Sequence, residues 1–195
     1  MMKNTWIFLS IITVGFLATW MGLASQSGER HNAVAADEKE TKSTKKMTSF
    51  TFQPIGVIHS PYSAISRPPR QGRLAPDVPA KIEIFEEFSE GLEGIEDFDC
   101  IYVIFVFDRS QGWTAKATPP SATHPRGVFA TRSPRRPCPI GLTPVRLEKR
   151  DGRFLHIKGI DAFDQTPVLD IKPYIGSIDA FPEAGRKVEK DLGLR

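Results

Sequence analysis

The sequence predicts a mainly-β domain, and two stretches carry that prediction. Residues 145–148 (VRLE) and 155–158 (LHIK) alternate apolar and polar side chains on either side of Asp151-Gly152. Period-two alternation around an Asp-Gly pair indicates a β-hairpin. Residues 100–107 (CIYVIFVF) are an unbroken apolar and aromatic run, whose length favours a strand buried on both sides over a helix. This strand should form the centre of the core.

The chain begins with a segment that is separate from this domain. After Lys3, the run from Trp6 to Ala24 is apolar and is interrupted only by a few small polar residues. Its length lies between that of a signal-peptide core and that of a short membrane span. We therefore predict that residues 1–25 are a signal peptide or a membrane anchor, unless translation starts at Met47 and they are not made.

Residues 26–49 are predicted to be a flexible linker, because they are polar and charged and include the stretch EKETKSTKK. The compartment depends on the start of the chain. A start at Met47, or an anchor with the domain facing inward, gives a cytoplasmic domain. Otherwise the domain is membrane-anchored, with membrane association through residues 6–24, or it is exported.

The domain spans residues 50–180 and opens with two predicted strands, at 52–58 and 80–85. Between them, residues 63–79 are irregular, rich in proline and carry three arginines. Loops of this length in a compact domain are usually functional or disordered. This loop is therefore either functional or an ordinary surface loop.

Three later features follow the two core stretches. Trp113, just past the strand at 100–107, could stack on a base or pack against the wall of the domain. Residues 166–174 are predicted to be a last extended segment. Residues 181–195 are predicted to be a C-terminal tail with a short helix, because Val188 and Leu192 are spaced i and i+4.

Charge is unevenly distributed, although the net charge is only +3. From Glu83 to Asp99 there are eight acids and no basic residue, whereas from Arg126 to Lys158 there are nine Lys and Arg against two acids. The basic segment favours a polyanionic partner, with a solvated basic surface as the alternative. The acidic segment is interpreted as a solvated face, or as a surface that meets the basic segment of a second subunit.

Residues 133–139 (SPRRPCP) form a stiff loop, because each of its three prolines fixes its own φ and restricts the residue before it. A stiff loop loses little entropy when it binds a ligand, so Arg135 and Arg136 are candidates for holding an anionic group. Cys138 is interpreted as a structural thiol rather than a nucleophile, because no histidine adjoins it in the sequence. The cysteines and histidines of the chain are scattered without metal-ligand spacing, so no metal site is predicted.

Five motifs occur in order along the domain: PIGVIHSPY (54–62), PPRQG (68–72), EGLEGIEDFDCIYVIFVF (90–107), RGVFATRSPRRPCPIG (126–141), and GID with DQTPVLDIKPY (159–174). They resemble those of the TsaA-like family of S-adenosyl-L-methionine-dependent tRNA methyltransferases. The resemblance implies a small β-barrel without a Rossmann domain, and a homodimer, whose active site we expect near the subunit boundary. It also implies methyl transfer to N6 of threonylcarbamoyl-adenosine beside the tRNA anticodon.

The resemblance further implies the residues of the site. Those expected to hold S-adenosyl-L-methionine match the family's donor-binding segments or follow the strand at 100–107: Arg70, Gln71, Gly72, Asp108, Arg109, Arg132, Ile160, Asp161, Ala162 and Phe163. Those expected to contact RNA are Arg135, Arg136 and Lys172. The acceptor nitrogen must lose a proton to a nearby base. The candidates are Asp161, Asp164 and Asp170, although each could equally be a turn former.

Two positions depart from the family's pattern. The usual Arg-Pro-Asn-Pro has Cys138 in place of the asparagine, which exchanges an amide for a weakly hydrogen-bonding thiol. The usual Asp-Gly-Thr-Pro has Gln165 in place of the glycine, and a glutamine at a positive φ costs about 1 kcal/mol. With the N-terminal segment, these departures support an alternative: a membrane-tethered or exported binding module that has lost methyl transfer.

Overall fold

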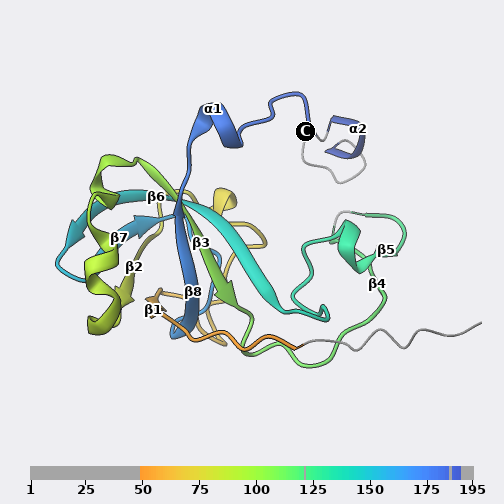
Figure 1. The fold of residues 1–195 in the computed structure, drawn as a ribbon. Coiled ribbons are helices and arrows are strands. Elements are labelled where there is room, and N and C mark those ends of the chain that lie inside the picture. The colour runs from red at the N-terminus through yellow and green to blue at the C-terminus, as the bar shows by residue number, and fades with distance from the viewer. Residues whose placement is uncertain (1–48, 121, 185, 190–195) are drawn as a thin grey trace, which may run out of the picture. The chain divides into compact units, whose positions relative to one another are not determined.

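The computed structural model describes residues 49–120, 122–184 and 186–189. Six strands form a closed antiparallel β-barrel in the order β1-β2-β7-β6-β3-β8 (Figure 1). Their bounds are β1 Gly56–His59, β2 Pro79–Ile84, β3 Cys100–Val106, β6 Ile140–Asp151, β7 Phe154–Lys158 and β8 Thr166–Pro173. The mainly-β prediction and the barrel implied by the resemblance are confirmed. The predicted N-terminal segment, and the linker up to residue 48, lie outside the described residues.

The predicted hairpin is formed by β6 and β7. The apolar residues of its alternation are buried: Val145, Leu147, Leu155 and Ile157. Asp151 pairs with Phe154, so the turn consists of Gly152 and Arg153, one residue later than predicted. Gly152 has a φ of 59°, which a glycine adopts without strain. β6 is longer than the alternation indicated and begins at Ile140.

β3 occupies the predicted stretch, but the prediction that it is buried on both sides is wrong. Its alternate residues Ile101, Val103 and Phe105 are at most 1% exposed, whereas the residues between them are only half-buried. A barrel encloses one face of each strand, and the other face points outward. The apolar outer side chains of β3, Tyr102 and Ile104 among them, are therefore only partly covered by the described part of the chain.

The remaining strand predictions hold within a few residues. β2 and β8 lie where residues 80–85 and 166–174 predicted them. β1 begins at Gly56, later than the predicted start at 52. A Cβ at Gly56 would lie 2.2 Å from the carbonyl oxygen of Glu83 on β2. Only glycine allows the two strands to approach this closely.

Short helices and a two-stranded ribbon complete the described structure. Their bounds are η1 Gly72–Leu74, η2 Glu86–Leu92, η3 Ile95–Asp97, β4 Lys116–Ala117, β5 Arg126–Gly127, η4 Val128–Ala130, α1 Gly176–Asp179 and α2 Arg186–Glu189. Helix α2 confirms the predicted short C-terminal helix. The acids of η2 and η3 are exposed, in agreement with a solvated acidic face. Within the described ranges, no helix is long and apolar enough to cross a membrane.

Candidate active site

A cavity of about 830 Å3 lies where four parts of the chain meet. They are the loop before η1, the segment after β3, the stiff loop with the first residues of β6, and the segment between β7 and β8. Six arginines line the cavity: Arg67, Arg70, Arg109, Arg132, Arg135 and Arg136. Two carboxylates, Asp108 and Asp161, lie among them. The cavity therefore carries an excess of positive charge with a local negative group.

Asp161 is the most buried carboxylate of this lining. Thr143 donates a hydrogen bond from Oγ1 to Asp161 Oδ1 over 2.5 Å. The backbone N–H groups of Gly72 and of Asp161 itself also donate to the carboxylate. Burial raises the pKa of Asp161 above its usual value, while these hydrogen bonds and the positive charge of Arg132 offset part of the rise. This carboxyl group is the strongest base candidate in the cavity.

A close backbone approach holds the PPRQG loop against the cavity. A Cβ at Gly72 would lie 1.8 Å from the carbonyl oxygen of Gly159, so no larger residue fits there. Immediately before Gly72, the Gln71 carbonyl oxygen Oε1 accepts a hydrogen bond from Arg132 Nη1. Gly72 thus joins the loop to the segment after β7, and Gln71 joins it to the stiff loop.

The turn from Phe163 to Gln165 supports another part of the wall, which Phe163 and Thr166 line. Arg109 donates from Nη2 to the carbonyl oxygen of Asp164 over 2.6 Å. Its guanidinium lies 5.0 Å from the centre of the Phe163 ring, within the range of a cation–π interaction. The carboxylate of Asp164 accepts a hydrogen bond from the backbone N–H of Ser60 at 3.2 Å. The side chain of Asp164 therefore fixes the turn to Ser60, while its backbone carbonyl group holds Arg109 of the cavity lining.

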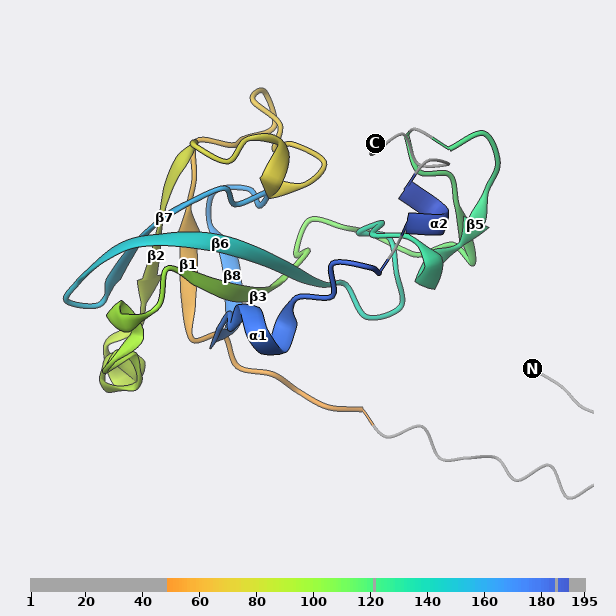
Figure 2. The ribbon, with the colours of Figure 1, turned by 90° about the horizontal axis from the view of Figure 1, so that it is seen from above.

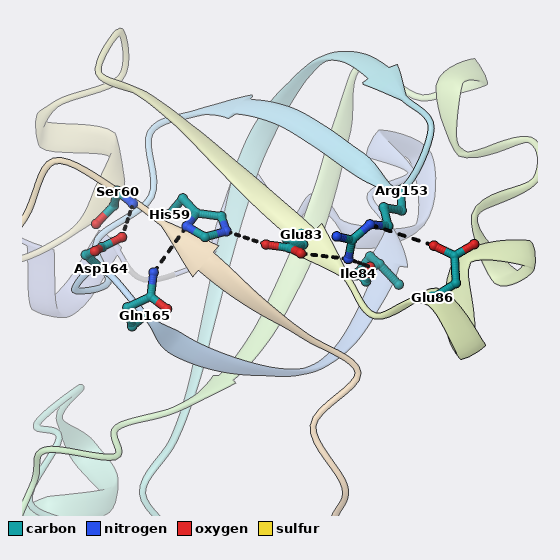
Figure 3. A network of polar contacts seen from close by, with 8 residues as sticks. All are labelled: His59, Ser60, Glu83, Ile84, Glu86, Arg153, Asp164 and Gln165. Atoms are coloured by element: carbon teal, nitrogen blue, oxygen red, sulfur yellow. Dashed lines mark hydrogen bonds and ion pairs between the residues drawn. The ribbon is translucent and has the colours of Figure 1, made fainter.

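A chain of polar contacts extends from this turn along the outside of the barrel (Figure 3). Gln165 Nε2 lies 3.2 Å from His59 Nδ1, and His59 Nε2 lies 2.8 Å from Glu83 Oε2. Arg153 Nη1 in turn lies 2.6 Å from Glu83 Oε1. The hydrogen bond from His59 and the positive charge of Arg153 hold the pKa of Glu83 below its usual value, against a smaller opposing effect of burial. Gln165 itself has a φ of 64°, so the expected strain at this departure from the family pattern is present.

The structure brings most of the expected site residues to the cavity. All donor-binding candidates except Gly72 and Ile160 line it, as do Arg135 and Arg136. Ile160 is fully buried in the core. Asp170 and Lys172 are not in the lining: they form an ion pair with each other at 2.8 Å on β8. Of the three aspartates considered as a base, only Asp161 has its place in the cavity wall.

Sequence reasoning missed several residues of the cavity. Thr143 and Leu142 line it although they lie outside every motif, and Phe107 lines it although it was not singled out within its motif. Tyr62 does not line the cavity but is close enough to Asp161 to feel its charge. Its hydroxyl is buried and has no hydrogen-bond partner among the described residues. Burial and, secondarily, the charge of Asp161 raise the pKa of Tyr62. A polar Thr143 at an inward position of a strand was the available signal, because such a residue needs a buried partner.

The departures from the family pattern lie outside the lining. Cys138 is exposed and Gln165 points toward His59, and neither side chain contributes to the cavity wall. Among the described residues, no group of three or more His, Cys, Asp or Glu side chains is arranged to hold a metal ion.

The fold and the site together define a small antiparallel β-barrel with an arginine-lined cavity beside β3 and β6. Residues 57–180 match the family model described as the tRNA-methyltransferase O N-terminal domain. The chain belongs to this family.

Relatives and solved structures agree with that assignment. A protein of Archaeoglobus fulgidus named probable S-adenosyl-L-methionine-binding protein is 48% identical over 138 residues, which are 71% of this chain and 37% of that protein. The tRNA (adenine(37)-N6)-methyltransferase of Escherichia coli is 36% identical over 148 residues, 71% of this chain and 63% of the relative. The crystal structure of TrmO from Pseudomonas aeruginosa superposes with a TM-score of 0.61 at 37% identity, covering 70% of this chain and 61% of that one. The chain thus spans less than two thirds of each of these three proteins.

Proposed function

We propose that this chain is an S-adenosyl-L-methionine-dependent methyltransferase that modifies N6 of adenine 37 in tRNA, on an adenosine that carries the threonylcarbamoyl group. One observation carries the proposal. Three motif segments far apart in the sequence, 70–71, 132–136 and 161–163, converge on a single cavity. The name of the Escherichia coli relative supports the reaction, and that of the Archaeoglobus relative supports the cofactor.

The cavity suits the chemistry of the methyl donor. Its volume lies within the range of about 300–1,000 Å3 that is typical of small-molecule sites. Arg70 and Arg132 suit the donor's carboxylate, because guanidinium groups pair with carboxylates through two hydrogen bonds. Phe163 and Leu142 offer apolar surface for the purine. Asp161 suits a hydroxyl or an ammonium group.

The residues of the chain would contribute position and a base. When bound, the donor supplies a methyl group on a positively charged sulfur: the sulfur–carbon bond breaks as the nitrogen–carbon bond forms, and sulfur leaves as a neutral thioether. The walls of the cavity are joined by the close approach at Gly72 and by the hydrogen bonds of Gln71 and Arg109. Walls fixed in this way hold the reacting atoms in line, which can supply much of the rate acceleration. Asp161 accepts the proton that N6 loses, and its raised pKa makes it a stronger base than an exposed aspartate.

The RNA side of the site is the arginine-rich rim. Arg135 and Arg136 are carried on the stiff loop and line the cavity, so they would hold phosphates next to the reacting base. Both tRNA and the donor are cytoplasmic. The proposal therefore requires that the domain faces the cytoplasm, either because translation starts at Met47 or because residues 6–24 anchor it there. The mass of the native N-terminus distinguishes the two.

The protein is proposed to act as a symmetric dimer with the site near the subunit boundary. Exposed apolar side chains lie just beyond β8, with Ile178 66% and Phe181 74% exposed. A second copy would cover them. The acidic segment 83–99 and the basic segment 126–158 have opposite charge, so a two-fold arrangement could pair them. Surface ion pairs are weak, and the apolar contact would therefore supply most of the affinity.

The test of the reaction uses the full chain, kept in a mild detergent because of its apolar N-terminus. It is incubated with S-adenosyl-L-methionine and tRNA bearing threonylcarbamoyl-adenosine. The tRNA is then digested to nucleosides, whose masses are measured by mass spectrometry. We expect one added methyl group on this nucleoside, and none with the Asp161→Asn variant. Donor binding measured by calorimetry, with no methylated product, would refute the proposal and favour a binding module.

A further inference from the structure

The chain makes a long excursion between β3 and β6, and both of its ends are fixed beside the cavity. We call residues 108–137 the basic arm. At its base, the Phe107 N–H donates to the carbonyl oxygen of Pro139 over 2.8 Å. One turn further out, Ser110 Oγ donates to the carbonyl oxygen of Pro134 over 3.0 Å. Residues of both ends line the cavity, so a partner bound to the arm lies next to a ligand bound in the cavity.

The arm has an ordered structure of its own. β4 pairs with β5 through Lys116 opposite Gly127. Figure 1 shows this ribbon apart from the barrel strands, and Figure 2 shows β5 apart from them in the second view. The pairing continues to Val128, whose N–H donates to the carbonyl oxygen of Ala115 over 2.9 Å. Val128 is only 2% exposed and anchors the ribbon. The side chains on the arm are therefore presented by a defined backbone.

Two large aromatic rings of the arm are exposed. Trp113 is 55% exposed and Phe129 is 79% exposed. They flank the Ala115–Val128 hydrogen bond: Trp113 lies two residues before Ala115, ahead of β4, and Phe129 follows Val128 within η4. Burial of Trp113 against the domain wall, one of the two alternatives for this residue, is thereby set aside. Exposed aromatic rings on an ordered ribbon mark a contact surface.

The charge of the arm indicates what it contacts. Residues 108–137 carry one acid, Asp108, and six basic residues: Arg109, Lys116, Arg126, Arg132, Arg135 and Arg136. A purely apolar partner would match the rings but not this charge. Single-stranded RNA matches both, because its phosphates pair with the basic residues and its unpaired bases stack on aromatic rings. A duplex offers phosphates but no free base faces.

We propose that the basic arm is a stacking platform for the unpaired nucleotides that flank the target adenine, with Trp113 and Phe129 contacting bases. Arg135 and Arg136 hold the phosphates between the platform and the cavity. The inference rests on the proposed function for the identity of the RNA. It adds a recognition surface outside the cavity. It also explains how the protein selects a single-stranded loop of the RNA rather than a double-helical stem.

The test compares RNA binding by the full chain and its Trp113→Ala, Trp113→Phe and Phe129→Ala variants. The probe is an anticodon stem–loop with adenosine at position 37 and the fluorescent base 2-aminopurine at the next nucleotide. Loss of one stacked base should weaken binding of the stem–loop about tenfold in Trp113→Ala. The fluorescence of 2-aminopurine in the complex should also be quenched less, because stacking causes the quenching. Trp113→Phe should restore most of the affinity. The salt dependence of binding should not change, because no charge is removed.

Phe52→Ala is the matched control, since Phe52 is 62% exposed and lies outside the arm. It should bind the stem–loop like the wild type, and all variants should bind S-adenosyl-L-methionine with unchanged affinity. Unaltered stem–loop binding by Trp113→Ala would overturn the proposal, as would an equal loss for a loopless duplex. A halved mass of Trp113→Ala in light scattering would assign the ring to a second copy of the chain instead.

Failure of the proposed function gives a different pattern. If no methylated nucleoside forms but Trp113→Ala still loses loop affinity, the platform stands and the reaction does not. If methyl transfer proceeds and Trp113→Ala leaves KM for tRNA unchanged, the reaction stands and the platform is refuted.

Discussion

Gln165 is the only non-glycine residue with a positive φ in the described part of the chain, and its strain can be measured directly. We expect Gln165→Gly to be more stable than Gln165→Ala, the reverse of the order at ordinary positions. A residue with a Cβ at a left-handed φ costs about 1–2 kcal/mol. Glycine removes that cost but has a more flexible unfolded chain, which offsets about 0.5–1 kcal/mol.

The comparison of the two variants isolates this backbone effect. Both lose the 3.2 Å contact between Gln165 and His59, so its contribution cancels. The glycine variant should therefore exceed the alanine variant by about 1 kcal/mol in free energy of unfolding. For a domain of this size the difference corresponds to a Tm higher by roughly 4 °C. The wild type cannot replace the alanine variant in this comparison, because its glutamine also makes the contact to His59.

Denaturant unfolding and thermal melts of the full chain provide the measurement, provided that the two variants share one m-value. Gln53, exposed and without a positive φ, is the matched control: there the alanine variant should be at least as stable as the glycine variant. An alanine variant equal to or better than glycine at position 165 would show that the backbone strain is absent in solution.

The charged and exposed side chains around the cavity give three further tests. Arg135→Ala should change the free energy of unfolding by less than about 0.5 kcal/mol but weaken tRNA binding and flatten its salt dependence; equal salt slopes would remove Arg135 from the RNA face. The pKa of Asp161 is raised by burial, so the wild type loses stability as the pH rises through that value. Asp161→Asn should therefore melt higher than the wild type at a pH of about 7, by a margin that shrinks in acid, while donor binding falls; a lower Tm at neutral pH would contradict the burial account. Light scattering should report twice the chain mass for the wild type at low and high salt and a single chain for Ile178→Asp; a monomeric wild type with activity would refute the proposed dimer.

The strands were predictable because their signal is local. Alternation at 145–148 and 155–158 fixes which side chains enter the barrel, and a two-residue turn closes the hairpin in only a few ways. The early start of β6 at Ile140 was not predictable, since Pro139 and the stiff loop immediately precede it. The one-sided burial of β3 depends on barrel closure, which an apolar run cannot report.

The candidate site was predictable only in part, for a different physical reason. Its walls come from segments that no local pattern joins. Apart from the stiff loop, whose arginines were candidates from the sequence itself, the motifs identified these segments only through the family resemblance. Thr143 and Asp161 are 18 residues apart and meet because β6 and the segment after β7 share the barrel interior. The aspartates show the limit most clearly. Asp161, Asp164 and Asp170 have the same chemistry, and only their partners separate a cavity carboxylate from a turn carboxylate and a surface ion pair.

The violations of ordinary packing rules gather around this cavity. A buried carboxylate at Asp161 and an unpartnered buried hydroxyl at Tyr62 each cost stability in the free protein. Under the proposed function, a bound donor would offset the cost of the Asp161 carboxylate. The strain at Gln165 differs, because its side chain faces His59 and no ligand would relieve it. Substitutions at Asp161 should therefore exchange binding for stability, whereas glycine at position 165 should relieve the strain and leave donor binding intact.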